Sequence, residues 1–366
     1  MRGLVAGVAL ALAVSATPAA ADTTPYLPAP AGHRPVGTTS LYLKDTSRAD
    51  PWVPSMPYRE LMVSVFYPAA SATGPKAQYV TPAESAAMLT GSGIEAAPDV
   101  LSKTRTNSVA QARPAGRDLP LVVLSPGYLR PRATLTALAE DLASHGYVVA
   151  LVGHTYEDVA TSFPDGRTVG CASCEVAHDH AFWQKLEAGR ATDVSFVLDK
   201  LTHSAWAGLI DPNRIGMAGH SVGGASVTPA MVADPRIRAG INIDGATNDV
   251  PLTPPGLSRP FMFMSHQLDP VTRCAPQRPD WEQDWAQLAG WKRWIEVAGT
   301  VHPSFTDVAL FADQYGVDIG ATTTAQRAQA ITRAYVNAFF DRHLRGRPSS
   351  LLDAPSSRYP EVAFCH

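Results

Sequence analysis

The sequence has few charged residues and almost no excess of either sign. Asp, Glu, Lys and Arg make up 17% of the 366 residues, the formal net charge is −3, and no run of basic residues occurs. An average soluble chain carries about 25% charged residues. Because a nucleic-acid-binding surface needs clustered Lys and Arg, we expect no nucleic-acid partner.

Long apolar runs are also scarce. Residues 4–14 form an apolar run, which is shorter than the roughly 20 residues needed to cross a bilayer, and no other run reaches that length. This run follows Arg2 and precedes the small residues 19–21, which is the layout of a secretory signal peptide. We therefore expect residues 1–21 to be cleaved and the mature chain, 22–366, to be secreted without a stable membrane span. A retained N-terminal anchor is the alternative.

Cysteine is rare as well. An even number of cysteines in an exported chain favours disulfides, and four cysteines allow three pairings, among which the sequence does not choose. The cysteines are Cys171, Cys174, Cys274 and Cys365. The spacing of Cys171 and Cys174, with His178 and His180 following, is also compatible with zinc or a redox pair. Export favours a disulfide, and we expect no metal.

Apolar runs alternate with helical patterns over most of the chain. The expected strands are 38–43, 61–67, 121–124, 147–152, 214–218, 241–243, 261–264 and 294–297, and the expected helices are 135–144, 191–201, 223–232 and 325–344. Buried strands alternating with helices predict an α/β fold with a mostly parallel sheet. The first two strands suit an antiparallel edge. We expect one domain over 22–366, with an insertion at 70–117.

The segment Gly219-His220-Ser221-Val222-Gly223 carries the strongest chemical signal. It follows an expected strand and opens an expected helix, which is the setting of a nucleophile elbow in α/β-hydrolases. Glycines two residues on either side of a serine let the strand and helix backbones pass closely. Ser221 is therefore the candidate nucleophile.

A serine needs a base, and in this fold the acid and the histidine follow it in the chain. His302 comes directly after the last expected strand and is the candidate base. His266 follows the earlier expected strand 261–264 and could line the site, but it comes too early to be the base. His343 lies on the final helix and His366 is the terminal residue.

Two aspartates are candidates for the acid. Asp244 and Asp269 each follow a strand, and both therefore belong at the sheet edge where sites of open α/β folds are built. Position alone favours Asp269, because the acid of this fold usually follows the later strand.

The oxyanion hole requires two backbone N–H groups. One should come from Val222, the residue after the nucleophile, and the other from the loop after strand 121–124. Pro126 in that loop has no N–H, so Tyr128 is the expected second donor.

The chain resembles the plasma-type platelet-activating-factor acetylhydrolases and their bacterial relatives. The resemblance covers most of the mature chain and is carried by residues 35–39, 59–63, 124–128, 141–147, 219–225 and 240–244, and by Val301-His302 with Phe305 and Asp307. One departure is Pro126, where that family has a histidine.

The resemblance implies an α/β-hydrolase fold, Asp244 as the acid, and a carboxylic-ester hydrolase that acts on lipid-like or short-acyl esters without a cofactor. It fixes neither the substrate nor the oligomeric state. A lipase- or cutinase-type polyester hydrolase with Asp269 as the acid stays open, and so does an acyltransferase of the cell envelope.

Four tryptophans lie close together in the sequence, at Trp281, Trp285, Trp291 and Trp294. Aromatic side chains supply large buried areas, so we expect these residues to pack beneath loops. Lining an acyl pocket is the alternative role.

Overall fold

The structure is a computed structural model, and it describes residues 24–274 and 278–366. The expected signal peptide, 1–21, lies outside the described residues. No helix within the described residues is long and apolar enough to cross a bilayer.

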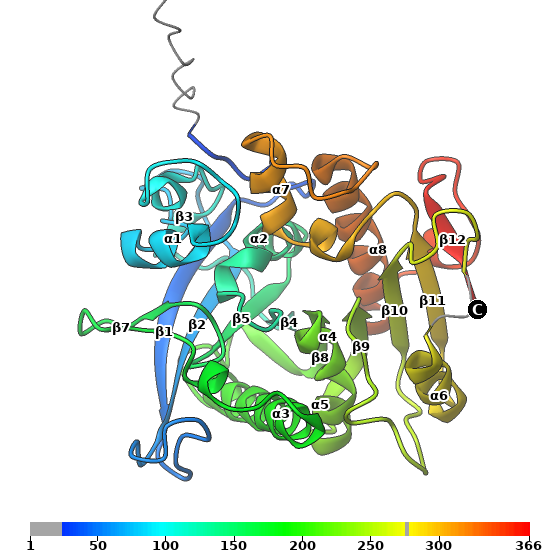
Figure 1. Cartoon of the computed structure of the whole chain (residues 1–366), viewed down its shortest axis with the longest axis horizontal. Coiled ribbons are helices and arrows are strands. Elements are labelled where there is room, and N and C mark those ends of the chain that lie inside the picture. The colour runs from blue at the N-terminus through cyan, green and yellow to red at the C-terminus, as the bar shows by residue number, and fades with distance from the viewer. Residues whose placement is uncertain (1–23, 275–277) are drawn as a thin grey trace, which may run out of the picture.

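A twisted sheet runs through the whole molecule, from β1 and β2 at one side to β12 near the C-terminus (Figure 1). The strand order is β12-β11-β10-β9-β8-β4-β5-β2-β1-β3, with bounds β1 Val36–Asp45, β2 Arg59–Pro68, β3 Val109–Ala110, β4 Leu119–Ser125, β5 Val148–His154, β8 Ile210–His220, β9 Ile237–Ile243, β10 Phe261–His266, β11 Lys292–Val297 and β12 Val362–Phe364. The six strands from β5 to β11 in this order are mutually parallel. β2 pairs antiparallel with β5, and β1 with β2, which confirms a mostly parallel sheet with an antiparallel N-terminal edge.

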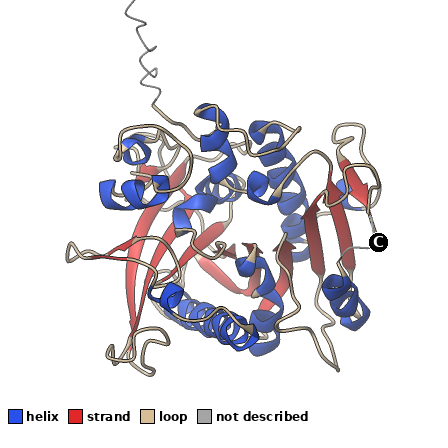
Figure 2. Ribbon diagram, in the orientation of Figure 1, coloured by secondary structure: helices blue, strands red, loops and turns tan. Residues whose placement is uncertain are grey.

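Helices cover both faces of the sheet (Figure 2). Their bounds are α1 Pro82–Leu89, α2 Thr136–Ser144, α3 His180–Thr202, α4 Val222–Ala225, α5 Val227–Ala233, α6 Pro279–Gln287, α7 Asp307–Gln314 and α8 Ala325–Arg345. Alternate residues of β4 show how the two faces are used, because successive side chains of a strand point to opposite faces. Val122 and Leu124 pack with α2 and α8, whereas Leu121 and Val123 pack with α3 and α5. All four side chains are fully buried.

Every expected strand is present, and the structure adds elements that the sequence analysis did not predict. The expected helix 223–232 is broken at Ser226 into α4 and α5. After the expected helix 325–344 the chain continues into β12, which pairs antiparallel with β11. The segment expected as an insertion, 70–117, contains α1, a 3-10 helix over Val100–Lys103, and β3, which lies parallel to β1. A small separate hairpin, β6 (Thr161–Ser162) and β7 (Thr168–Val169), stands beside β1.

The tryptophans pack as expected. Trp281 is fully buried, and its ring lies 4.6 Å from that of Phe263 and 5.2 Å from that of Trp294. Trp285 and Trp291 are partly buried against the two main apolar clusters. The alternative role, lining an acyl pocket, is not what the packing shows.

All four cysteines form disulfides, Cys171–Cys174 and Cys274–Cys365. The first pair therefore offers no thiolate to zinc, and the metal-site alternative for this segment is wrong. His178 instead shares a hydrogen bond with the Tyr128 hydroxyl, and His180 pairs with Asp249.

Candidate active site

The expected site residues meet at one edge of the sheet because they follow the carboxyl ends of neighbouring parallel strands. Ser221 follows β8, Asp244 follows β9, His266 ends β10, and His302 comes after β11. The loop that carries Tyr128 follows β4, the strand on the other side of β8. Ligand sites of open α/β sheets are built at this edge.

The serine sits in a strained turn between β8 and α4. Ser221 has φ 58° and ψ −131°, a region that costs a non-glycine residue about 1–3 kcal/mol and persists where the surrounding structure enforces it. The flanking glycines are required by space. A Cβ on Gly219 would lie 2.1 Å from the Gly223 carbonyl oxygen, and one on Gly223 would lie 2.2 Å from that of Ser125. The elbow geometry expected from the sequence is therefore present.

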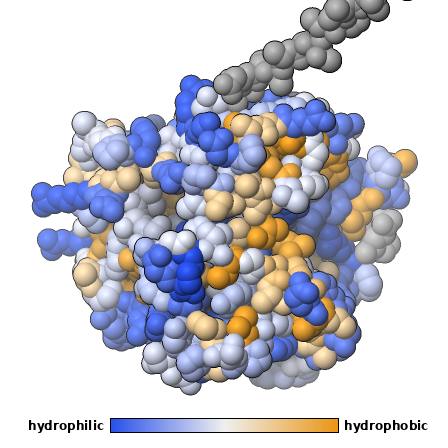
Figure 3. Space-filling model, turned by 60° about the vertical axis from the view of Figure 1, so that its left-hand side comes forward, coloured by the Kyte–Doolittle hydropathy of each residue, from blue (hydrophilic) through white to orange (hydrophobic). Residues whose placement is uncertain are grey.

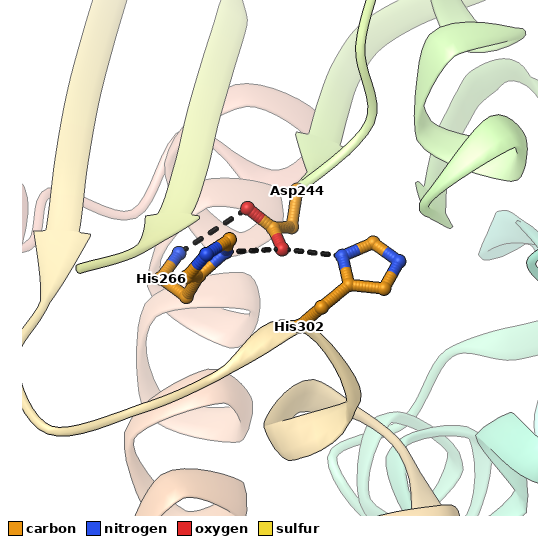
Figure 4. Close-up of side chains that lie close together, drawn as sticks. All are labelled: Asp244, His266 and His302. Atoms are coloured by element: carbon orange, nitrogen blue, oxygen red, sulfur yellow. Dashed lines mark hydrogen bonds and ion pairs between the residues drawn. The ribbon is translucent and has the colours of Figure 1, made fainter. Parts of the chain in front are cut away.

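Asp244 and His302 form a direct pair. His302 Nδ1 lies 2.6 Å from Asp244 Oδ2 (Figure 4). Asp244 is 2% exposed, whereas the His302 side chain is 47% exposed. Because a carboxylate oxygen accepts, the proton of His302 lies on Nδ1, and Nε2 keeps its lone pair free to accept a proton. Figure 4 shows this second nitrogen on the side of the ring away from Asp244.

His220 ties the His302 loop to the residue before the serine. Its Nε2 lies 2.8 Å from the His302 carbonyl oxygen, and the two rings are 4.5 Å apart. Burial, helped by the nearby His302, lowers the pKa of His220 to about 3. His220 is therefore neutral at ordinary pH and donates through Nε2–H, which holds the His302 backbone against the elbow.

Two further residues bind the Asp244 carboxylate. His266 Nδ1 lies 2.6 Å from Oδ2, and Arg278 Nη2 lies 2.6 Å from Oδ1. Burial alone would raise the pKa of Asp244, but the hydrogen bonds from His266 and His302 and the charge of Arg278 outweigh it and hold the pKa well below its usual range. Asp244 is thus ionised at neutral pH.

These contacts are predictable only in part. His266 is expected to line the site because it follows the expected strand 261–264. Arg278 carried no local signal, because its contact with Asp244 joins residues 34 positions apart.

Asp244, His266 and His302 also have the composition of a metal site, since one ligand atom from each lies within 4.8 Å of the others. A cation there would displace the imidazole hydrogen bonds to Asp244, and it would stand beside the Arg278 guanidinium. These three residues therefore suit a carboxylate that accepts hydrogen bonds from two histidines better than they suit a metal site.

The loop after β4 approaches the serine closely. A Cβ on Gly127 would lie 3.2 Å from the Cβ of Ser221. Two hydrogen bonds hold this loop in place. Arg190 donates to the Pro126 carbonyl at 2.5 Å. The Leu129 N–H donates to the Glu157 carbonyl at 2.9 Å. Arg190 and Glu157 are themselves a buried ion pair, with 2.8 Å between Nε and Oε2.

The ring of Tyr128 is anchored away from the sheet. Its hydroxyl lies 3.1 Å from Ser173 Oγ, within the loop that the Cys171–Cys174 disulfide closes, and 3.1 Å from Nε2 of His178, which follows that loop. Its ring packs with the cluster that contains Val222. The two expected oxyanion donors thus come from neighbouring parts of the structure.

The remaining expected candidates lie elsewhere. Asp269 accepts hydrogen bonds from the N–H groups of Val271 and Thr272 in a turn, and within the described residues it contacts no histidine side chain. His343 packs on Trp291, and His366 pairs with Glu282.

Comparison with known proteins identifies the family of the chain. A family model for PET hydrolase-like proteins matches residues 108–309, more than half of the chain and a span that includes the elbow, Asp244 and His302. The chain belongs to the PET hydrolase-like family.

The relatives of this PET hydrolase-like chain include an esterase of known structure. It is 44% identical to a ferulic acid esterase from Streptomyces cinnamoneus, with a TM-score of 0.85 over 94% of this chain and 100% of that structure. The match confirms the α/β-hydrolase fold and shows the protein to be a carboxylic-ester hydrolase.

Two curated relatives confirm the resemblance to platelet-activating-factor acetylhydrolases. A probable 1-alkyl-2-acetylglycerophosphocholine esterase from Arthroderma benhamiae is 28% identical over 97% of both chains. A platelet-activating factor acetylhydrolase from Canis lupus familiaris is 26% identical over 52% of this chain and 49% of its own length, so this match spans about half of the mammalian protein.

Proposed function

We propose that this PET hydrolase-like protein is a secreted serine esterase that cleaves lipid-like or short-acyl carboxylic esters through an acyl-enzyme on Ser221. The observation that carries the proposal is the 2.6 Å pair of His302 Nδ1 and buried Asp244, tied through His220 to a strained serine elbow. A serine hydroxyl becomes a useful nucleophile only with such an oriented base.

In the first half-reaction Ser221 Oγ attacks the ester carbonyl carbon, and the proton of the hydroxyl passes to His302 Nε2. The ionised Asp244 stabilises the resulting imidazolium. The carbonyl oxygen becomes an oxyanion that accepts hydrogen bonds from the backbone N–H groups of Tyr128 and Val222. When the tetrahedral intermediate collapses, the bond to the alcohol oxygen breaks and His302 returns the proton to that leaving oxygen.

In the second half-reaction water replaces the alcohol. His302 takes a proton from water, the hydroxide oxygen bonds to the acyl carbon, and the second tetrahedral intermediate collapses with the proton returning to Ser221 Oγ. The products are a carboxylic acid and the free enzyme. This chemistry requires no cofactor, because every proton and charge is handled by the named groups.

The proposed substrates are inferred from the names of the similar proteins. Their names refer to feruloyl, acetyl-glycerophosphocholine and terephthalate esters, which share an ester carbonyl and differ in the groups on either side. Secretion is supported by the two disulfides, since such bonds persist in oxidising compartments.

The test is covalent labelling. We expect a fluorescent organophosphonate to label the wild-type protein, and we expect the label and p-nitrophenyl acetate hydrolysis both to disappear in Ser221→Ala. Ser226→Ala, in the same elbow region, is the matched control and should keep the label. A folded wild-type protein that takes no label, or a Ser221→Ala variant that still does, would contradict the proposal.

Product analysis separates hydrolysis from acyl transfer. With excess alcohol or sugar present, the proposal expects the free acid as the main product, and a dominant new ester would make the protein a transferase. The class of the natural substrate is tested by comparing the rates of hydrolysis of methyl ferulate, a short-chain phospholipid and a polyester film.

A further inference from the structure

A hollow of about 390 Å³ lies beside the site, between α1, the loop after β4, and α7. Its walls come from parts of the chain that are far apart in sequence: residues 87–94 with Leu101, residues 129–134, Val159, and residues 303–319. We call it the α1–α7 hollow. The α1 wall belongs to the segment that the sequence analysis expected as an insertion.

The walls of the hollow are mainly apolar and only partly buried. Among the described residues that line it, Arg130 is the one charged residue. The half-buried side chains include Met88, Leu89, Val308 and Val317. Met88 and Leu89 pack on a small apolar core. The base of the hollow is therefore buried, while these lining side chains stay partly exposed to solvent. Apolar cavities of roughly 300–1,000 Å³ with few polar groups are typical of small-molecule sites.

The hollow adjoins the reacting position on two sides. On the first side, a Cβ on Gly127 would lie 3.2 Å from Ser221 Cβ and 3.5 Å from Arg130 Cγ, so the Arg130 stem faces the serine across Gly127. On the second side, the lining residue Pro303 directly follows His302. A group attached to an ester carbon at Ser221 is therefore within reach of the hollow.

On the space-filling face of Figure 3, apolar residues gather in patches near the middle of the molecule, whereas hydrophilic residues dominate its edges. Contact with a hydrocarbon group would remove such side chains from water, which is favourable in proportion to the area covered.

We propose that the α1–α7 hollow binds the hydrocarbon part of the ester and so sets which chain lengths the enzyme accepts. The inference rests on the proposed function, because it requires the ester carbon to be at Ser221. The hydrocarbon group could belong to the acyl or to the alcohol side of the ester, and the experiment below distinguishes the two.

Two variants change the size of the hollow in opposite directions. Val317→Trp narrows it, and Met88→Ala widens it. Val232→Trp is the matched control, since Val232 is 59% exposed on α5 and does not line the hollow. Each protein is assayed on p-nitrophenyl esters from acetyl to palmitoyl, in which the acyl length varies, and on acetate esters of linear alcohols, in which the alcohol length varies.

In the series whose variable part enters the hollow, we expect Val317→Trp to lower kcat/KM for the longer members by about ten-fold or more, because each methylene accommodated in an apolar pocket is worth about ten-fold or more in discrimination. The acetyl or methyl member should change little. Met88→Ala should move the optimum to longer chains, and Val232→Trp should leave the profile as in the wild type.

Unchanged chain-length profiles in both series, for both variants, would overturn the inference. That result is separate from failure of the proposed function, because the wild-type protein would still hydrolyse p-nitrophenyl acetate and take the phosphonate label. If Val317→Trp is unfolded by circular dichroism, Met88→Ala decides alone.

Discussion

At the residue scale, Asp244 is held by more groups than an orienting carboxylate needs. His302 and His266 both bind Oδ2, and Arg278 binds Oδ1. The carboxylate cannot rotate without breaking several of these contacts, and the depressed pKa keeps it ionised. These contacts fix the orientation of the carboxylate and therefore that of the His302 ring. They also keep the His302 proton on Nδ1, so that Nε2 can accept the proton of the serine hydroxyl.

The choice between the two candidate acids can be measured. We expect Asp244→Asn to lower kcat by about 10⁴-fold, because an amide in that place favours the wrong tautomer of the base and cannot stabilise its cation. Asp269→Asn should change kcat little, since Asn can still accept the two turn hydrogen bonds. The measurement is kcat on p-nitrophenyl acetate, with circular dichroism to verify the fold. A larger loss in Asp269→Asn would reverse the assignment.

At the element scale, α7 begins with a buried acid. Asp307 is 1% exposed; the Ala137 N–H donates to it at 3.2 Å, and so does the Tyr79 hydroxyl at the same distance. Burial raises the pKa of Asp307 to about 8. The native state therefore keeps a proton that the unfolded chain loses near the usual carboxyl pKa. Between roughly pH 4 and pH 8 the native state binds more protons, so this group's contribution to stability falls as the pH rises.

We expect Asp307→Asn to remove this dependence, because an amide stays neutral at every pH. The unfolding free energy of the variant, relative to wild type, should rise by at most about 1.4 kcal/mol per pH unit across that window. Urea denaturation at pH 5, 6, 7 and 8 measures it. Asp313→Asn, an exposed position on the same helix, is the control and should run parallel to wild type. Parallel curves for Asp307→Asn as well would show that Asp307 is ionised in the native state.

The elements also show what a sequence can predict here. Six of the eight expected strands are predictable because buried parallel strands are short apolar runs. Ser221 is predictable because its turn demands glycines at fixed spacing. The short helices α1, α6 and α7 are not predicted, whereas α2, which is equally short, is predicted from the helical spacing of its leucines. β12 is not predicted because it has three residues and pairs with β11, over 60 residues earlier. The place of Asp269 in a separate turn, and the contact of Arg278 with Asp244, depend on tertiary packing that no local pattern records.

At the scale of the whole molecule, the two disulfides do different work. Cys274–Cys365 joins the segment after β10 to the last residues of the chain. The two cysteines are 91 positions apart in the sequence, so the disulfide closes a long loop. It holds β12 against β11, at the far edge of the sheet. Cys171–Cys174 spans three residues and closes the loop that binds the Tyr128 hydroxyl. The first pair restricts the unfolded chain, whereas the second shapes the surroundings of the site.

Replacing each pair by serine should separate stability from activity. In the chain-entropy description, a loop of this size is worth about 4–5 kcal/mol and the short loop about 2 kcal/mol. We therefore expect the Cys274→Ser/Cys365→Ser variant to lose about 2–3 kcal/mol more unfolding free energy than Cys171→Ser/Cys174→Ser, by the same loop-length relation.

The Cys171→Ser/Cys174→Ser variant should instead show the greater fall in kcat, because the loop that binds the Tyr128 hydroxyl loosens while the sheet stays intact. Urea denaturation and p-nitrophenyl acetate hydrolysis, measured on both variants, give the two quantities. Equal stability losses together with equal kcat would mean that the short disulfide does not support the loop beside Ser221.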